Sequence, residues 1–156
     1  MSSNTPVKFF RPNSGKYALF SNFSESTIVI DGLSYPTVEH YFQSQKFSDL
    51  QYREKIRNAP TPNVAKILGN SKKLPIRSDW DTYRNKVMMV ALTAKRDQNA
   101  EFRRLLLSTG SRLLIENSPY DYYWGCGRNG TGNNMLGTML MRIRASMVVE
   151  AKKNKD

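Results

Sequence analysis

Helix start and stop signals recur through the middle of this 156-residue chain, and they constrain its fold more than any other feature. Thr61-Pro62 followed by Gly69 predicts a helix between them, because Thr caps a first turn and Pro fits it. Ser78-Asp79-Trp80 opens the longest predicted helix in the same way. Pro36 and the following Thr predict another helix. The remaining signals complete a series of helices at 37–47, 49–58 (capped by Ser48), 99–108 and 135–152.

Short β-prone runs separate these helices. Val7–Phe10 is one, and Ile28–Ile30 turns through Asp31-Gly32 into Leu33–Tyr35 as a hairpin. A further strand is expected at 112–116, with an irregular stretch at 120–127. Together these elements predict the α+β class: a single compact, helix-rich domain with a small β-sheet. We expect this domain to span 9–151, between a disordered N-terminal tail (1–8) and a basic C-terminal tail (152–156).

The charge of the chain favours a polyanionic partner. Lys and Arg number 24 against 13 Asp and Glu, which gives a net charge of +11. Such an excess suits nucleic acid or a substrate with several phosphates, although an ordinary solvated basic surface stays open as an alternative. The apolar runs are far shorter than the roughly 18–20 residues of a membrane helix, and the N-terminus has no signal-peptide pattern. With a single cysteine and hence no internal disulfide, we expect a cytoplasmic or nuclear protein without membrane contact.

The first polar cluster lies in the helix predicted after Pro36. Glu39, Gln43 and Lys46 stand at i, i+4 and i+7 and therefore share one stripe of it. An acid, an amide and an amine on one face can donate a proton, position a substrate and act as a nucleophile. The alternative is a solvated stripe with a weak charge pair. His40 is read as a packed or capping residue, and one His with one Cys predicts no metal site.

The second cluster, 118–137, contains five glycines, several aromatic residues and Asp121 directly ahead of the last predicted helix. Glycines let a backbone approach a ligand closely, and free amides at a helix start attract anions. Gly125, Gly127 and Gly130 match a dinucleotide fingerprint formally, but no βαβ pattern surrounds them. A ligand-binding loop and a tight structural turn both fit the pattern.

Two smaller features add candidate ligand contacts. Asn22 stands beside Phe23 in a Phe-Ser-Asn-Phe string, which suits a sugar or base, although an ordinary Asn turn would look the same. Arg77 and Trp80 lie at a predicted helix start, where an Arg can bind a phosphate in a bidentate manner. The alternative here is a helix cap followed by a core tryptophan.

These residues resemble the NADAR (YbiA-like) family over about 9–147. The resemblance rests on motifs that occur in the family's order. They are Phe20-Ser-Asn-Phe23, Pro36-Thr-Val-Glu-His-Tyr-Phe-Gln43 with Lys46-Phe47, Thr61-Pro62 with Gly69, Arg77 with Asp79-Trp80, and Trp124-Gly-x-Gly127-x-x-Gly130-x-Gly132-x-Asn134.

The resemblance implies an α+β fold and cofactor-free hydrolysis of N-glycosidic bonds. Glu39 would be the acid/base, Lys46 an amine nucleophile and Asp121 a third catalytic residue. The implied substrate-binding residues are Asn22, Phe23, Tyr35, His40, Gln43, Arg77, Trp80, Tyr120, Trp124, Gly125, Gly127, Asn133 and Asn134.

Two substrate classes follow from the resemblance. The leading prediction is removal of ADP-ribose from ADP-ribosylated guanine, in nucleic acid or as a nucleotide, by a monomeric enzyme, as in DNA repair. The alternatives are an N-glycosidase for a phosphoribosylamino-pyrimidine of riboflavin biosynthesis and a non-catalytic ADP-ribose-binding module. Chemically, either Lys46 forms a Schiff base with the sugar, or Glu39 protonates the leaving nitrogen while Asp121 stabilises an oxocarbenium-like state.

Overall fold

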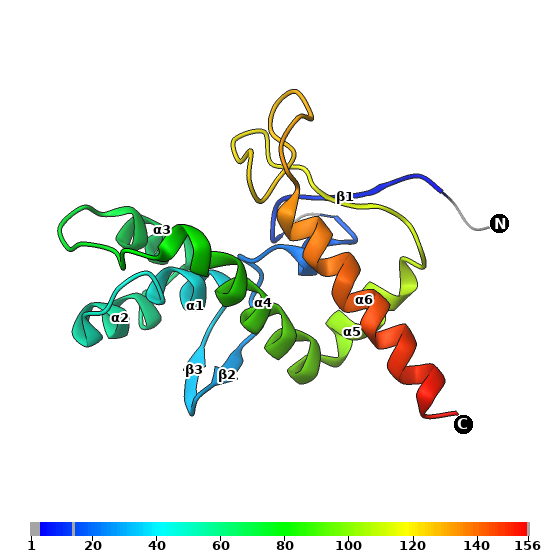
Figure 1. Ribbon diagram of the computed structural model, residues 1–156, viewed down its shortest axis with the longest axis horizontal. Coiled ribbons are helices and arrows are strands. Elements are labelled where there is room, and N and C mark those ends of the chain that lie inside the picture. Colours follow the sequence, from blue (N-terminus) through cyan, green and yellow to red (C-terminus); the bar gives the residue numbers. More distant parts are fainter. Residues whose placement is uncertain (1–3, 14, 156) are drawn as a thin grey trace. The chain divides into compact units, whose positions relative to one another are not determined.

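The computed structural model describes residues 4–13 and 15–155 (Figure 1). Their contacts divide the chain into two units. One unit runs continuously from Asn22 to Gln98. The other combines the N-terminal segment up to Ser21 with the C-terminal part from Asn99.

The 22–98 unit begins with a two-stranded antiparallel hairpin. Strand β2 (Ile28–Ile30) pairs with β3 (Leu33–Tyr35), so that Ile28 lies opposite Tyr35. Asp31 and Gly32, between the strands, have φ values of 53° and 79°. Two successive residues with positive φ make the type I′ turn that suits the twist of a hairpin. The predicted hairpin is therefore confirmed at its predicted residues.

Four helices follow the hairpin in this unit, and the first of them is central. Helix α1 contacts each of the other three, as its place in Figure 1 shows. All seven residues of α1 are consequently buried, polar side chains included. The helices are α1 (Val38–Ser44), α2 (Leu50–Arg57), α3 (Pro62–Asn70) and α4 (Trp80–Gln98).

The other unit combines strands and helices from both ends of the chain. Phe20 lies at its core, fully buried, with edge-to-face contacts to Phe9 and Phe102 at centroid distances of 5.6 and 6.0 Å. Strand β1 pairs in parallel with β4, which packs against α6. The elements are β1 (Val7–Phe9), the 3₁₀ helix η1 (Ala18–Phe20), α5 (Ala100–Ser108), β4 (Leu114–Glu116) and α6 (Met135–Lys153).

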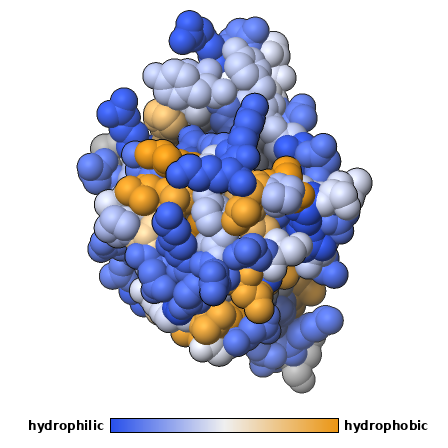
Figure 2. Space-filling view, turned by 90° about the vertical axis from the view of Figure 1, so that its left-hand side faces the viewer, coloured by the Kyte–Doolittle hydropathy of each residue, from blue (hydrophilic) through white to orange (hydrophobic). Residues whose placement is uncertain are grey.

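The surface around α1–α3 is largely polar. Figure 2 faces the side of the molecule on which these helices lie in Figure 1 and shows hydrophilic side chains with separate apolar patches between them. No helix in the described part of the chain combines the length and the apolar character needed to cross a bilayer. This surface favours polar or charged ligands over a large hydrophobic partner.

The predicted fold class, helix-rich α+β with little sheet, is confirmed, and several boundaries are corrected. Helix α1 ends at Ser44 rather than at 47, because the amides of Lys46 and Phe47 bond three residues back in a tighter turn. Asp49, not Ser48, caps α2, since its carboxylate accepts from the Tyr52 amide at 2.8 Å.

The predicted tails are also shorter than expected. Strand β1 begins at Val7, inside the segment 1–8, and α6 continues to Lys153, inside the segment 152–156. The predicted boundaries of the two tails, at residues 8 and 152, are therefore wrong. Residues 1–3 and 156 lie outside the described residues.

Candidate active site

Helix α1 holds the candidate acid in a buried position. Its first turn is capped by Thr37, whose hydroxyl accepts from the His40 amide at 3.1 Å. Glu39 follows the cap and is 7% exposed, and Gln43, one turn later, is 4% exposed. These values exclude a solvated stripe for the two side chains, because water does not cover either of them.

Gln43 holds the Glu39 carboxylate within α1. Its Nε2 donates to Glu39 Oε1 at 2.6 Å, as the i, i+4 spacing allows. The Glu39 amide donates to the carbonyl oxygen of Asn22 at 3.1 Å, which brings the 22–23 segment against the start of α1. A buried carboxylate is costly without such partners, so these contacts fix its position.

Two amide oxygens near this carboxylate lack protein donors. Asn22 Oδ1 and Gln43 Oε1 are buried and have no hydrogen-bond partner within the described residues. The Asn22 amide nitrogen makes a weak contact to Met88 Sδ at 3.5 Å. An unsatisfied buried acceptor costs about 1–3 kcal/mol, and such groups are rare in folded proteins. The pair suits donors on a bound ligand, such as sugar hydroxyls.

Helix α3 packs directly over Gln43. A Cβ added at Gly69 would overlap the Gln43 side-chain amide, so only glycine allows this approach. Gly69, predicted as a stop signal, is in fact a packing residue inside α3, which continues to Asn70. The close approach also places the last turn of α3 beside Lys46.

Lys46 is half-buried beyond the end of α1. Its Nζ donates to the Gly69 carbonyl at 3.4 Å and to Asn70 Oδ1 at 3.2 Å. Its own carbonyl accepts from the Arg77 amide at 2.8 Å. Backbone hydrogen bonding thus holds the main chain of Lys46, and α3 holds its amine, while part of the side chain stays accessible.

The electrostatic environment links Lys46 to Glu39. Burial lowers the pKa of Lys46 from its ordinary value, the Glu39 carboxylate raises it in part, and the nearby Lys66 ammonium lowers it further. Lys66 Nζ also lies 5.9 Å from the centre of the Phe23 ring. The lowered pKa increases the neutral fraction of the amine, which is the nucleophilic form.

Sequence reasoning missed Lys66 and Asn70 on α3. Together with Gly69 they occupy i, i+3 and i+4 of this predicted helix and so share one face. That spacing was the signal in the sequence that could have identified these residues as a group. Only the packing of α3 onto α1 shows that the face meets Lys46.

A second lysine with a lowered pKa is not a candidate nucleophile. Lys95 on α4 is fully buried and donates to Ser24 Oγ at 3.1 Å. Burial lowers its pKa to about 7. Lys95 has no exposed surface, whereas Lys46 is half-buried and interacts electrostatically with Glu39, so Lys46 is the better candidate nucleophile.

His40 packs inside the unit, as the residues alone predicted, and the ligand contact implied for it by the family resemblance is less favoured. It is 1% exposed, with Nδ1 2.8 Å from Thr37 Oγ1 and Nε2 3.0 Å from the Ala59 carbonyl oxygen. Because a carbonyl only accepts, Nε2 carries the proton and both ring nitrogens are used. Burial also lowers the pKa of His40, so the ring stays neutral.

Two aromatic residues of the predicted site are also largely buried. Tyr35 is 5% exposed and packs edge-on against Tyr41 at a centroid distance of 5.1 Å. Burial raises the pKa of Tyr35. Trp80 is 6% exposed and packs against Phe42 at 5.1 Å. The alternative of a core tryptophan therefore describes Trp80 better than substrate contact.

Arg77 already has an anionic partner. Its Nε and Nη2 donate to the two oxygens of Asp79 at 2.6 and 3.0 Å. The guanidinium also lies 3.7 Å from the centre of the Tyr83 ring. A phosphate would have to compete with Asp79, so the geometry gives Arg77 a structural role at the start of α4.

The glycine-rich segment of the other unit folds back on itself. Asp121 Oδ1 accepts from the amides of Tyr123 and Trp124 at 2.9 and 2.7 Å, which makes it a turn residue rather than the predicted catalytic one. A Cβ at Gly125 would meet Glu116, and one at Gly127 would meet the Tyr122 ring. These contacts favour the tight structural turn over the ligand loop.

Two amides at the start of the helix after this segment are already used by the segment itself. The amides of Met135 and Leu136 donate to the carbonyls of Tyr123 and Trp124 at 3.0 and 3.1 Å. An anion site at the start of α6 is therefore less favoured, because the turn uses those two donors itself.

The two asparagines of the segment that were predicted as ligand contacts are also tied to the turn. Asn134 accepts from the Glu116 amide at 3.0 Å and donates to the Leu114 carbonyl at 2.9 Å, which extends the edge of β4. The backbone amide of the exposed Asn133 donates to the Tyr122 carbonyl at 2.8 Å. Tyr120 remains as a side chain accessible to ligands, at 76% exposure.

Comparisons with known proteins show the family to which the chain belongs. The NADAR domain family matches residues 8–148. N-glycosidase YbiA of Escherichia coli K12 is 45% identical over 147 residues, which cover 94% of this chain and 91% of that protein. The NMR structure of E. coli YbiA superimposes with a TM-score of 0.88 at 42% identity, covering 97% of this chain and 89% of that one.

A longer relative contains a segment that is similar to this chain. The riboflavin biosynthesis protein VVA0006 of Vibrio vulnificus is 34% identical over 149 residues, which span 96% of this chain but 40% of that protein. These findings define an enzyme: an N-glycosidase, a hydrolase that acts on N-glycosyl bonds. The chain belongs to the NADAR family.

Proposed function

We propose that the chain removes ADP-ribose from ADP-ribosylated guanine, in nucleic acid or as a nucleotide. The bond hydrolysed joins the ribose C1 to the exocyclic nitrogen of guanine. The observation that carries this proposal is the electrostatic pairing of the buried Glu39 carboxylate with the half-buried Lys46 amine, whose pKa is lowered. A proton donor beside a partly neutral amine is what the opening and capture of a glycosylamine require.

The reaction begins with opening of the ribose ring. Glu39 takes a proton from the Lys46 ammonium and passes it to the ring oxygen, which leaves the Lys46 amine neutral, and the C1–nitrogen bond becomes an iminium. Lys46 Nζ adds to C1, and the guanine amine leaves with a proton, so that C1 stays joined to Lys46 as a Schiff base. Water then adds to C1, releases the sugar as an aldehyde that closes to ADP-ribose, and restores the amine.

The surrounding amides position the substrate and the acid. Gln43 holds the Glu39 carboxylate through its Nε2, and its Oε1 and Asn22 Oδ1 are free to accept from ribose hydroxyls. Hydrogen bonds to the sugar would satisfy both buried oxygens, so substrate binding would relieve an existing cost.

A direct hydrolysis through an oxocarbenium-like state is the competing route. It needs Asp121 to stabilise charge or orient water. Because Asp121 Oδ1 already accepts from two backbone amides, that role is less favoured than the lysine route.

A phosphoribosylamino-pyrimidine of riboflavin biosynthesis is the second candidate substrate. It shares the bond between C1 and an exocyclic nitrogen, and the relative from V. vulnificus is a riboflavin biosynthesis protein. The net charge of +11 favours the guanine substrate, since nucleic acid offers many phosphates and the pyrimidine only one. A non-catalytic ADP-ribose-binding module would have no use for the Glu39–Lys46 pair.

A substrate panel tests the proposal. The purified chain is incubated with an ADP-ribosylated guanine oligonucleotide and with the pyrimidine intermediate, beside Glu39→Gln and the control Glu54→Gln on α2. We expect faster turnover of the oligonucleotide, a loss of about 10²–10⁴-fold in Glu39→Gln, and no loss in the control. If only the pyrimidine is turned over, the pyrimidine and not ADP-ribosylated guanine is the substrate. ADP-ribose binding without turnover of either compound would instead support the binding module.

A further inference from the structure

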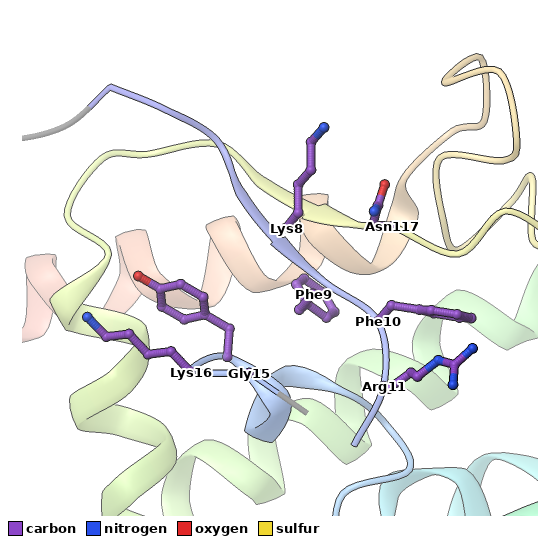
Figure 3. Close-up of a pocket in the computed structure, with 8 residues that line it drawn as sticks. Lys8, Phe9, Phe10, Arg11, Gly15, Lys16 and Asn117 are labelled. Atoms are coloured by element: carbon purple, nitrogen blue, oxygen red, sulfur yellow. The ribbon is translucent and has the colours of Figure 1, made fainter. Parts of the chain in front are cut away.

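A cavity of about 330 Å³ lies in the unit formed by the two ends of the chain (Figure 3). Strand β1 and the segment after it supply most of its lining, and Asn117, which follows β4, completes it. Its volume is in the range of small-ligand sites. Its lining residues are Lys8, Phe9, Phe10, Arg11, Gly15, Lys16, Tyr17 and Asn117, and none of them belongs to the candidate active site.

The lining is cationic. Lys8, Arg11 and Lys16 are all exposed, and no carboxylate is among the described residues that line the cavity. Figure 3 shows these three side chains leaving the cavity in different directions rather than converging on one point. Cations spread in this way suit successive phosphates of a polymer better than a single phosphate group.

Aromatic rings alternate with these cations. Arg11 lies 5.8 Å from the centre of the Phe10 ring, and Lys16 lies 5.6 Å from the centre of the Tyr17 ring. Phe10 in turn contacts Tyr120 at a centroid distance of 6.5 Å, and Tyr120 is 76% exposed. An exposed ring next to a basic groove is the arrangement on which unpaired bases stack.

We propose that this cavity binds a single-stranded nucleic acid. Lys8, Arg11 and Lys16 contact successive phosphates, and one base stacks on the pair formed by Phe10 and Tyr120. Stacking needs the open face of a base, which a duplex covers with its neighbours, so the single strand is the favoured form. The choice of a nucleic acid as ligand rests on the proposed function. The cavity adds to that function a contact for the strand that carries the modified guanine.

Binding of unmodified nucleic acid tests this cavity without any catalysis. A fluorescent single-stranded oligonucleotide about twelve nucleotides long is titrated with the wild type and with a Lys8→Gln/Lys16→Gln variant at several salt concentrations. We expect about tenfold weaker binding and a log–log salt slope reduced by about 1.4, since each lost phosphate contact removes about 0.7. The matched control, Lys72→Gln/Lys73→Gln, neutralises two exposed lysines of the other unit and should change neither value by as much.

A Tyr120→Ala variant tests the stacking contact. We expect roughly 5- to 150-fold weaker binding with an unchanged salt slope. Unchanged affinity in this variant, an equal loss in the control, or equally tight binding of the matching duplex would each overturn the proposal.

Turnover of a modified guanosine monophosphate separates this proposal from the proposed function. The Lys8→Gln/Lys16→Gln variant should keep wild-type turnover of this small substrate while losing affinity for the strand. If the wild type binds the strand as predicted but does not turn over the modified nucleotide, the proposed function is contradicted and the nucleic-acid site is not.

Discussion

Gln43 Nε2 and Glu39 Oε1 are joined by a 2.6 Å hydrogen bond inside a helix whose residues are all buried. This contact sets the direction of the carboxylate that the proposed reaction uses as its acid. It also explains why the acid and the amide stand four residues apart, since this spacing brings side chains together on a helix.

Removal of this hydrogen bond should cost both stability and activity. Gln43→Leu leaves a buried carboxylate without its amide donor, and we expect a loss of about 1–3 kcal/mol in the free energy of unfolding. The exposed Gln51→Leu on α2 should change it by less than about 0.5 kcal/mol. Urea unfolding of both variants measures the difference, and equal values would show that the contact contributes little.

The pH profile of the reaction should respond to Lys66. Its charge lowers the pKa of Lys46, so Lys66→Gln should raise that pKa and move the rising limb of kcat/KM to higher pH. We expect this shift to be small, because Lys66 is exposed and water screens its charge. The exposed Lys55→Gln on α2 serves as control. A limb that stays in place in Lys66→Gln would contradict the assignment of Lys46.

Stability should depend on pH through Lys95. Its pKa is about 7 in the folded chain against 10.5 for an ordinary lysine. Between these values the unfolded chain binds a proton that the folded chain does not, so the free energy of unfolding rises with pH.

We therefore expect the wild type to gain stability relative to Lys95→Met from pH 7 upward, by at most about 1.4 kcal/mol per pH unit. Below pH 7 both states carry the proton and the difference between the two proteins should level off. Thermal or urea unfolding of the pair from pH 6 to 9.5 checks this, and a difference that does not change with pH would contradict it.

Asp121 distinguishes the two chemical routes. Asp121→Asn keeps an oxygen that can accept from the amides of Tyr123 and Trp124, and the lysine route predicts turnover within a few-fold of wild type. A loss of about 10²-fold or more in a well-folded Asp121→Asn would support the oxocarbenium-like route. Steady-state kinetics with a circular-dichroism check of folding measures this.

Local signals in the sequence predicted most of the secondary structure. The cap at Thr61 is confirmed, since its side chain accepts from the amide of Val64 at 3.1 Å. A cap acts over three residues, so the sequence contains all the information that it needs. The error at Ser48 arose because Asp49, directly beside it, is an equally good cap.

The pairing of β1 with β4 could not be predicted in this way. The two strands are three residues long and lie about a hundred positions apart in the chain, with Val7 opposite Leu114. No turn connects them, and so no local signal sets their register.

For the site, residue spacing predicted Glu39 and Gln43 correctly as neighbours, but it left the glycine-rich segment open between a ligand loop and a structural turn. There, Asn134 and Asp121 bond to nearby backbone, and polar side chains in such turns look the same in sequence as ligand contacts. The role of Lys66 and Asn70 depends on how α3 packs on α1, which a sequence does not state.

Reductive trapping tests the central claim most directly. The chain is incubated with ADP-ribosylated guanine and cyanoborohydride, digested, and mapped by mass spectrometry, with Lys46→Arg and the exposed Lys55→Arg in parallel. We predict a reduced ribosyl adduct on Lys46 in the wild type and in Lys55→Arg, and neither adduct nor turnover in Lys46→Arg. An active wild type without an adduct at Lys46, or near-full turnover by Lys46→Arg, would contradict the account.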